Sequence, residues 1–298
     1  MKNILIIGCG LLGSSLVKSI KRKKIAKRIF IYEKSKKNIL KIKKLNLPGK
    51  ILKSLKDGVI NADLIIFCTP MSEYKKIILK LNNFISPNCL ITDIGSSKME
   101  SSKIIKRFLK KKTSWVSSHP IAGSEVSGPE HGKHNMFVDR WCILIKDKNT
   151  KKNHLNILNK FWKRIGSKTV TMTAKKHDKI FSITSHLPHL IAYNLVKSAQ
   201  DFEKKQNFDL IRYSAGGLRD FSRIAASNEI MWRDIFFDNK INISKAINLF
   251  IKNLKSFRKD INSKNNKSIL KKLTQTKKVR SKIIKLKQDV NKPNFGRD

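Results

Sequence analysis

The chain has 298 residues, of which 40% are hydrophobic, and its formal net charge is +44 because 65 Lys and Arg face 21 Asp and Glu. At roughly 100–200 residues per domain this length indicates two domains, and the apolar content excludes general disorder. Apolar runs such as 4–7 and 64–67 are far shorter than the roughly 20 residues that span a bilayer, which excludes transmembrane helices. Since the N-terminus also lacks a signal-peptide pattern, we expect a cytoplasmic protein.

The positive charge admits two interpretations. It is typical of nucleic-acid binding, yet most basic residues are Lys, spread along the chain without a zinc finger or an aromatic-rich RNA-binding strand. We favour a solvated, compositionally biased surface that can also attract small anionic substrates, and we expect no nucleic-acid partner. Four cysteines without metal-ligand spacing are interpreted as buried residues of a reducing compartment: Cys9, Cys68, Cys89 and Cys142.

The first half of the chain alternates short apolar runs with helical stretches. Alternation of this kind indicates a parallel sheet covered by helices on both faces. We therefore predict a doubly wound, mainly parallel α/β domain over residues 1–148. Its predicted strands cover 3–7, 28–32, 64–69, 89–93, 114–117 and 141–146, and a helix follows the first strand over 13–20.

Helical periodicity dominates the second half, and 169–172 is its one candidate strand. The polar segment 147–152 marks the predicted domain boundary. We predict an all-α domain over 149–290 and a frayed tail over 291–298. The helical stretches are 155–165, 176–198, 241–257 and 269–287.

A glycine-rich turn follows the first predicted strand, with Gly8, Gly10 and Gly13 in G-x-G-x-x-G spacing. The first glycine allows a tight turn, the second lets the backbone approach a pyrophosphate, and the third lets helix and strand pack closely. The free N–H groups of the helix start, at Leu11 and Leu12, would face the phosphates. In this strand–turn–helix context the motif predicts a dinucleotide site in a Rossmann domain.

Further residues of this site are predicted at the ends of later strands. Glu33 ends the second strand, where an acid can bind the ribose hydroxyls and repel a 2′-phosphate, which favours NAD; the neighbouring Lys34 leaves NADP open. Ligands of open parallel sheets bind outside the carboxyl ends of the strands. We therefore add Thr69, Pro70, Asp93 and Gly95 to the predicted cofactor site.

Three later segments are dense in chemically active residue types: SHPIAGSE at 118–125, SHLPH at 185–189, and GGLRDFSRIA at 216–225, followed by MWRD at 231–234. In this order behind a dinucleotide motif, they resemble the prephenate/arogenate (cyclohexadienyl) dehydrogenase family, over residues 2 to about 253. The resemblance implies an N-terminal Rossmann domain, a helical domain that forms a homodimer, and NAD(P)-dependent oxidative decarboxylation of prephenate or arogenate in tyrosine biosynthesis.

The resemblance also implies roles for three residues. His119 corresponds to the family histidine that assists deprotonation of the substrate 4-hydroxyl, which suits an imidazole near neutral pH. Ser96 corresponds to a serine near the same hydroxyl, although it could also cap a helix. Arg223 corresponds to the arginine that binds the ring carboxylate; a structural salt bridge is its alternative.

The remaining pocket residues come from the same resemblance. Glu125 would either modulate the pocket mouth electrostatically or serve structure alone, and Trp232 would line the pocket or belong to the core. A metal site at His186 and His189 is not expected because no carboxylate or cysteine completes it. His131, His134, His154 and His177 are given no role. The predicted substrate-binding set is Arg223, His189, His186, Glu125, Trp232, Gly217 and Asp220.

Two other functions compete with this interpretation. A two-domain dehydrogenase of the hydroxyacid or sugar-acid kind shares the domain plan but usually relies on a helical lysine as base. A non-catalytic, nucleotide-sensing or nucleic-acid-binding Rossmann protein would explain the charge. It would leave His119, Ser96 and Arg223 without a purpose.

Overall fold

The computed structural model describes residues 1–110, 113–207 and 209–289. The predicted tail at 291–298 lies outside these residues. The chain divides into two compact units, residues 1–243 and 244–298.

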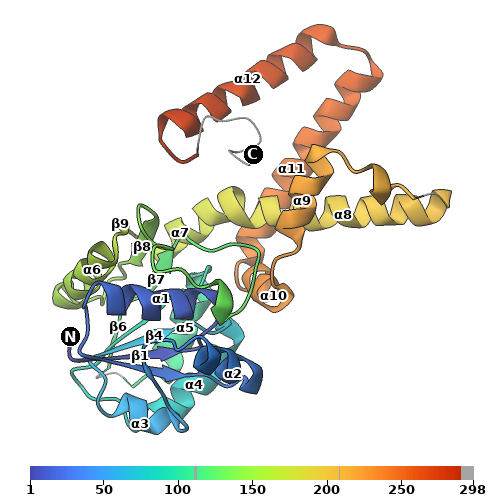
Figure 1. The fold of residues 1–298 in the computed structure, drawn as a ribbon. Helices are drawn as coiled ribbons and strands as arrows, with labels where there is room; N and C mark the ends of the chain where they lie inside the picture. Colours follow the sequence, from blue (N-terminus) through green and yellow to red (C-terminus); the bar gives the residue numbers. More distant parts are fainter. Residues whose placement is uncertain (111–112, 208, 290–298) are drawn as a thin grey trace. The chain divides into compact units, whose positions relative to one another are not determined.

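The first unit contains a six-stranded parallel sheet in the order β3-β2-β1-β4-β5-β6 (Figure 1). The predicted parallel α/β domain is confirmed. The strand order reverses between β1 and β4, and the carboxyl edge at such a reversal is where dinucleotides bind. The strands are β1 Asn3–Ile7, β2 Arg28–Tyr32, β3 Lys50–Ile51, β4 Leu64–Phe67, β5 Leu90–Asp93 and β6 Ser114–Trp115; the helices between them are α1 Leu11–Arg22, α2 Lys36–Lys44, α3 Leu55–Val59, η1 Met71–Glu73, α4 Tyr74–Leu81 and α5 Met99–Phe108.

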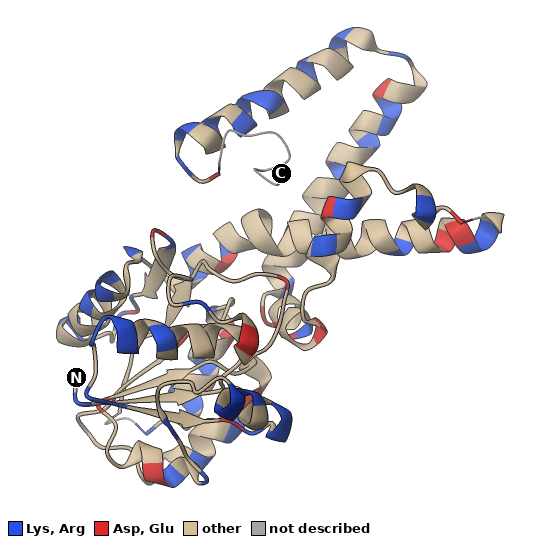
Figure 2. Cartoon of the chain, viewed as in Figure 1, with Lys and Arg blue, Asp and Glu red and all other residues tan. Residues whose placement is uncertain are grey.

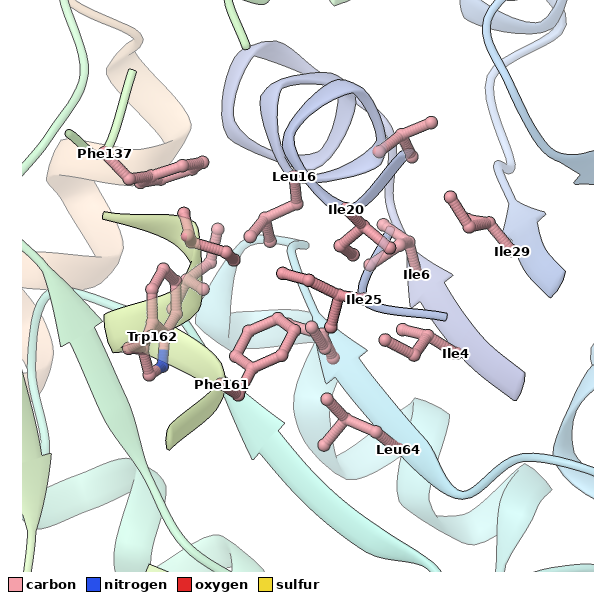
Figure 3. Packing of buried hydrophobic residues seen from close by; sticks show 14 of the residues in the cluster. Ile4, Ile6, Leu16, Ile20, Ile25, Ile29, Leu64, Phe137, Phe161 and Trp162 are labelled. Carbon is pink, nitrogen blue, oxygen red and sulfur yellow. The ribbon is translucent and has the colours of Figure 1, made fainter. Parts of the chain in front are cut away.

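The central strands are apolar throughout because both of their faces are covered. In β1, Ile4 and Ile6 belong to one buried cluster and Leu5 and Ile7 to another, as the alternation of side chains along a strand requires. Figure 3 shows Leu16 and Ile20 of α1 packed near Ile4 and Ile6 in the first cluster. Because the strands are held by this burial, the loops at their carboxyl ends, which carry the polar residues of the predicted site, are held in place as well.

A second sheet of three strands lies beyond the first, in the order β7-β8-β9. It consists of β7 Ser118–Pro120, β8 Trp141–Ile145 and β9 Lys168–Met172, with η2 Pro129–His131 and α6 Lys152–Ile165 in the connections. The strand predicted over 114–117 is present as β6 but ends at Trp115, because the chain then leaves the large sheet and enters the small one at Ser118. Since β9 pairs with β8, the sheet extends past residue 148, and the predicted boundary there stays a prediction.

A long helical segment follows β9 and contains one wide turn. It comprises α7 Ala174–Phe181, the π-helical turn η3 Ser182–His186 and α8 Leu187–Gln206. Pro188 has no N–H for the carbonyl four residues earlier, and Leu187 N–H instead bonds the Ser182 carbonyl, five residues back. The wide turn therefore shifts α8 out of the helical register of α7. The remaining helices of this unit are η4 Ile211–Tyr213, α9 Gly216–Ala225 and α10 Glu229–Asp238.

In the described part of the second unit, up to residue 289, the chain forms the helices α11 Lys240–Asn262, which begins in the first unit, and α12 Asn266–Lys285. Asp260 joins them by accepting hydrogen bonds from Ser268 Oγ at 2.5 Å and Lys272 Nζ at 2.6 Å. Figure 2 shows Lys and Arg along α12 and on helices of the first unit such as α1 and α2. None of the described helices combines the length and apolar character that a membrane span requires.

Candidate active site

The glycine-rich loop meets the demands of a dinucleotide cradle. Gly8 has φ +88°, and a Cβ there would lie 2.8 Å from the Cys68 carbonyl oxygen, while a Cβ on Gly13 would lie 2.2 Å from the Gly8 oxygen. A Cβ on Gly10 would meet nothing within 4 Å, so open space adjoins the backbone at the position predicted to approach a pyrophosphate. No side chain caps the N-terminus of α1, which leaves its N–H groups available to phosphate oxygens.

Glu33 lies beside this loop at the end of β2. Its Oε2 accepts a hydrogen bond from Cys9 N–H and its Oε1 one from Ser35 N–H, both at 2.8 Å. The carboxylate is thereby fixed next to the glycine turn, where the ribose of a dinucleotide lies in this fold. Lys34 is the cation that kept NADP possible, because it could pair with a 2′-phosphate. Its Nζ lies 3.9 Å from a Glu73 carboxylate oxygen.

The polar side chains at the ends of β4 and β5 differ in whether protein groups already bind them. Thr69 Oγ1 is buried without a hydrogen-bond partner in the described part of the chain, and Pro70 precedes η1. This hydroxyl is therefore available to hydrogen-bond a ligand. Asp93, in contrast, is fully buried and accepts from Tyr74, Ser117 and the Gly95 N–H. Its oxygens bind protein donors, so the predicted place of Asp93 in the cofactor site stays a prediction.

Lys98 completes the surroundings of Asp93. Its Nζ lies 2.8 Å from Asp93 Oδ2 and donates to the Ser118 carbonyl at 2.7 Å, and both charged side chains are 0% exposed. The pair therefore ties the end of β5 to β7 next to His119. Nothing in the spacing of the sequence signalled this contact.

We expect Lys98→Met to lower the free energy of unfolding by about 3–5 kcal/mol, because it leaves the Asp93 charge buried and uncompensated. Urea unfolding followed by circular dichroism measures the change. The control is Lys103→Met, which breaks an exposed pair with Glu100 and should cost at most about 1 kcal/mol. Equal losses in the two variants would mean that the Lys98–Asp93 pair does not hold the strand ends.

His119 begins a chain of three buried side chains. Its Nδ1 lies 2.8 Å from His177 Nε2, and His177 Nδ1 lies 2.8 Å from Asp178 Oδ1. Asp178 also accepts from the N–H groups of Lys98 and Met99, each at 2.8 Å, at the start of α5. These amide donors fix the carboxylate, which in turn orients His177.

The hydrogen bonds determine the protonation of each ring. The Asp178 carboxylate only accepts, so His177 Nδ1 donates and its Nε2 accepts when the ring is neutral. His119 Nδ1 must then donate, which leaves the lone pair of its Nε2 free. That nitrogen makes no hydrogen bond with the described residues, so it is available to take a proton from a substrate.

The electrostatic surroundings favour the neutral form of both rings. Burial lowers the pKa of His119 well below 6.5, with further lowering by His177, Lys98 and His186. Burial and Lys98 likewise lower the pKa of His177. His177, for which the sequence predicts no role, is thus the residue that orients the predicted base. The adjacent pair His177-Asp178 was the only signal for it.

Ser96 lies half-buried in the loop between β5 and α5. The helix begins at Met99 with Lys98 as its N-cap, so the alternative assignment of Ser96 as the helix cap is wrong. The Ser96 backbone lies against His186, whose pKa it raises while burial lowers that pKa more strongly. Ser96 and His186, predicted separately, are therefore brought together.

His189 and Trp232 form a second group. Their rings stack with centroids 3.8 Å apart and an angle of 22°, and His189 Nδ1 donates to the Ser185 carbonyl at 2.9 Å. Trp232 is 5% exposed and packs in a core cluster, while its buried Nε1–H has no partner among the residues described. Trp232 is therefore both a core residue and a hydrogen-bond donor without a partner in the described part of the chain.

Arg223 and Glu125 make a third group. Arg223 Nη1 lies 3.4 Å from Glu125 Oε2, with the side chains 42% and 31% exposed. Arg223, Gly217 and Asp220 share α9, and a Cβ on Gly217 would meet nothing within 4 Å. No hydrogen bond or ring contact among the described residues joins His119 to Arg223 or His189. His186 connects two of these groups, because its ring lies 6.2 Å from that of Trp232 and it also lowers the pKa of His119.

A glycine cradle at the reversal of a six-stranded parallel sheet, with a neutral buried imidazole beyond the strand ends, defines a dinucleotide-dependent dehydrogenase. Residues 16–171 match the family model described as prephenate dehydrogenase, nucleotide-binding domain, and residues 173–275 that described as prephenate dehydrogenase, dimerization domain. The chain belongs to the prephenate dehydrogenase family. It is therefore not assigned to the hydroxyacid dehydrogenases.

Relatives resemble the chain over almost its whole length. The cyclohexadienyl dehydrogenase of Zymomonas mobilis is 33% identical over 279 residues, which cover 94% of this chain and 95% of the relative. The prephenate dehydrogenase of Bacillus subtilis is 32% identical, over 86% of this chain and 69% of the relative. The crystal structure of Aquifex aeolicus prephenate dehydrogenase, in complex with hydroxyphenyl propionate and NAD+, has a TM-score of 0.88 at 33% identity and covers 95% of this chain and 98% of that one.

Proposed function

We propose that this protein catalyses the NAD-dependent oxidative decarboxylation of prephenate, arogenate or both, in tyrosine biosynthesis. The observation that carries the proposal is the chain from Asp178 through His177 to His119, which leaves His119 Nε2 as a free base beside a dinucleotide cradle. The names of the relatives and their extent of similarity support the same reaction.

The reaction needs a proton acceptor at one oxygen of the substrate. The ring carries a 4-hydroxyl and a quaternary carbon with a carboxylate. NAD, when bound, would supply the acceptor for the hydride that leaves C4. His119 Nε2 takes the hydroxyl proton at the same time, so that the oxygen becomes a carbonyl. The bond to the carboxylate then breaks, carbon dioxide leaves, the ring becomes aromatic, and the proton returns to the oxygen as a phenol.

Other residues bind and orient the two ligands in this proposal. Arg223 pairs with the ring carboxylate, replacing its contact with Glu125, and Ser96 hydrogen-bonds the 4-hydroxyl. The remaining substrate pocket consists of His189, His186, Trp232, Gly217 and Asp220. The proposed cofactor site consists of Gly8, Gly10, Leu11, Leu12, Gly13, Glu33, Thr69, Pro70, Asp93 and Gly95. Open space at Gly10 and the unpartnered Thr69 hydroxyl support NAD at this place.

The pH dependence of kcat/KM follows from the lowered pKa of His119. Because the base must be unprotonated, activity is lost as pH falls through that pKa, which burial and then His177 hold below 6.5. We expect kcat/KM to stay level from neutral pH down past 6.5 before it falls. Steady-state rates across the acid range measure this limb. An acid limb centred above 6.5 would contradict the assignment.

Steady-state turnover tests the proposed reaction. Prephenate and arogenate are each assayed with NAD and with NADP by nicotinamide absorbance. We expect turnover of at least one substrate, with a higher kcat/KM for NAD because Glu33 repels a 2′-phosphate. Failure with both substrates, from folded protein that binds NAD, would overturn the proposal.

We also propose a cytoplasmic homodimer. The match of residues 173–275 to a dimerization-domain model supports self-association, and the four free cysteines suit a reducing compartment. We further propose that the two domains meet near residue 148 and that the protein has no nucleic-acid partner. Light scattering coupled to size-exclusion chromatography should give the mass of two chains; the mass of one chain would contradict the dimer.

A further inference from the structure

His186 is buried at the end of the π-helical turn, and its two ring nitrogens have different surroundings. Nδ1 lies 3.1 Å from Asn239 Nδ2, whereas Nε2 is buried with no hydrogen-bond partner in the described residues. The Ser96 backbone lies close enough to influence the ring, but it does not meet Nε2 with hydrogen-bond geometry. One nitrogen is therefore held by protein and the other is not.

The orientation of the Asn239 amide follows from its other contacts. Asn239 Nδ2 lies 2.8 Å from the Asp178 carbonyl, which can only accept, and Asn239 Oδ1 accepts from Asn242 Nδ2 at 2.7 Å. The nitrogen that faces His186 is thus a donor, and His186 Nδ1 must supply a lone pair. In a neutral ring the proton then lies on Nε2.

We propose that Asn239 is a positioning residue that fixes His186 as the neutral Nε2–H tautomer and so presents a buried hydrogen-bond donor to a carbonyl or hydroxyl oxygen of a ligand beside Ser96. Asn239 is itself 3% exposed, so water does not compete for its amide. The choice of ligand rests on the proposed function; the tautomer rests on the protein contacts alone.

The charged and titratable groups around His186 agree with a neutral ring. The pKa of His186 is lowered to about 4, mainly by burial; Asp178 and the Ser96 backbone raise it, and His189 contributes a smaller lowering. His119 and His177 interact with the same ring and are themselves held neutral. The ring therefore stays uncharged at neutral pH.

Asn239 also connects His186 with the chain that ends at His119. The same Nδ2 donates to His186 and to the backbone of Asp178, whose carboxylate orients His177. One amide thus supports two opposite roles, a donor at His186 Nε2 and an acceptor at His119 Nε2. A buried N–H without a partner is unfavourable, which is the reason to expect a ligand oxygen there.

Histidine NMR tests the tautomer on the full-length protein without substrate. The protein is labelled with ¹⁵N-histidine, and the His186 signals are identified by their loss in His186→Gln. We expect Nε2–H, with no titration between about pH 5 and 8. Protonation at Nδ1 in the unmodified protein would overturn the proposal, whether or not Asn239→Asp folds.

Asn239→Asp removes the donor and places a carboxylate at Nδ1. We expect His186 Nδ1 to become protonated and the ring to titrate within this pH range, while the matched change Asn194→Asp, on the exposed side of α8, leaves the His186 signals unchanged. A folded Asn239→Asp protein with the original tautomer would reject the role of Asn239. Because these spectra need no turnover, they remain decisive even if neither prephenate nor arogenate is a substrate.

Discussion

Replacing His119 by Asn is expected to lower kcat by about 10²–10⁴-fold and to leave KM nearly unchanged. The magnitude is that of losing a positioned general base. The amide group of Asn has nearly the shape of the part of the imidazole ring closest to Cβ. It has no nitrogen at the position of Nε2, so it cannot accept a proton there. Steady-state kinetics with saturating NAD measure the two constants separately.

A suitable control for this variant is His131→Asn, because the His131 side chain is 45% exposed and lies on η2. Its turnover should match that of the unmodified protein. NAD affinity and the unfolding midpoint of His119→Asn should also stay close to normal. Unchanged turnover in a folded His119→Asn protein would reject His119 as the base.

Arg223→Ala is expected to raise KM by roughly 10- to 150-fold with a much smaller effect on kcat. Loss of a hydrogen-bonded charged partner costs about 1.5–3 kcal/mol, and each 1.4 kcal/mol corresponds to a factor of ten. The effect falls on KM because a carboxylate that is bound alike before and during the reaction contributes uniform binding.

The control for Arg223→Ala is Arg212→Ala, an exposed residue of η4. It removes the same charge from a surface that already carries a large positive excess, so KM should hardly change. If the two variants had the same KM, the effect of Arg223 would be general electrostatic attraction, and Arg223 would be removed from the carboxylate site.

Local sequence patterns were sufficient for the dinucleotide half of the site. The glycine spacing, the apolar strand before it and the acid at Glu33 lie within about thirty residues, where short-range rules apply. The strands β1 and β2 have the predicted bounds because both faces of the sheet demand apolar residues. Glycines 8 and 13 proved essential to close contacts inside the loop.

The support of His119 could not be predicted in the same way. His119 and His177 are 58 positions apart, and Lys98 reaches Ser118 across 20 positions. These contacts arise where β7, α7 and the start of α5 pack together, a tertiary arrangement that periodicity does not encode. The π-helical turn was also missed, although Pro188 gave a physical reason to expect an irregular helix there.

The stoichiometry of carbon dioxide release tests the central claim most directly. Substrate labelled with ¹⁴C in the ring carboxylate is incubated with the enzyme and NAD, and trapped carbon dioxide is compared with NADH absorbance. The mechanism at His119 and Arg223 predicts equal amounts of carbon dioxide and NADH throughout the reaction. NADH formed without release of the label would contradict it, because hydride transfer would then occur without decarboxylation.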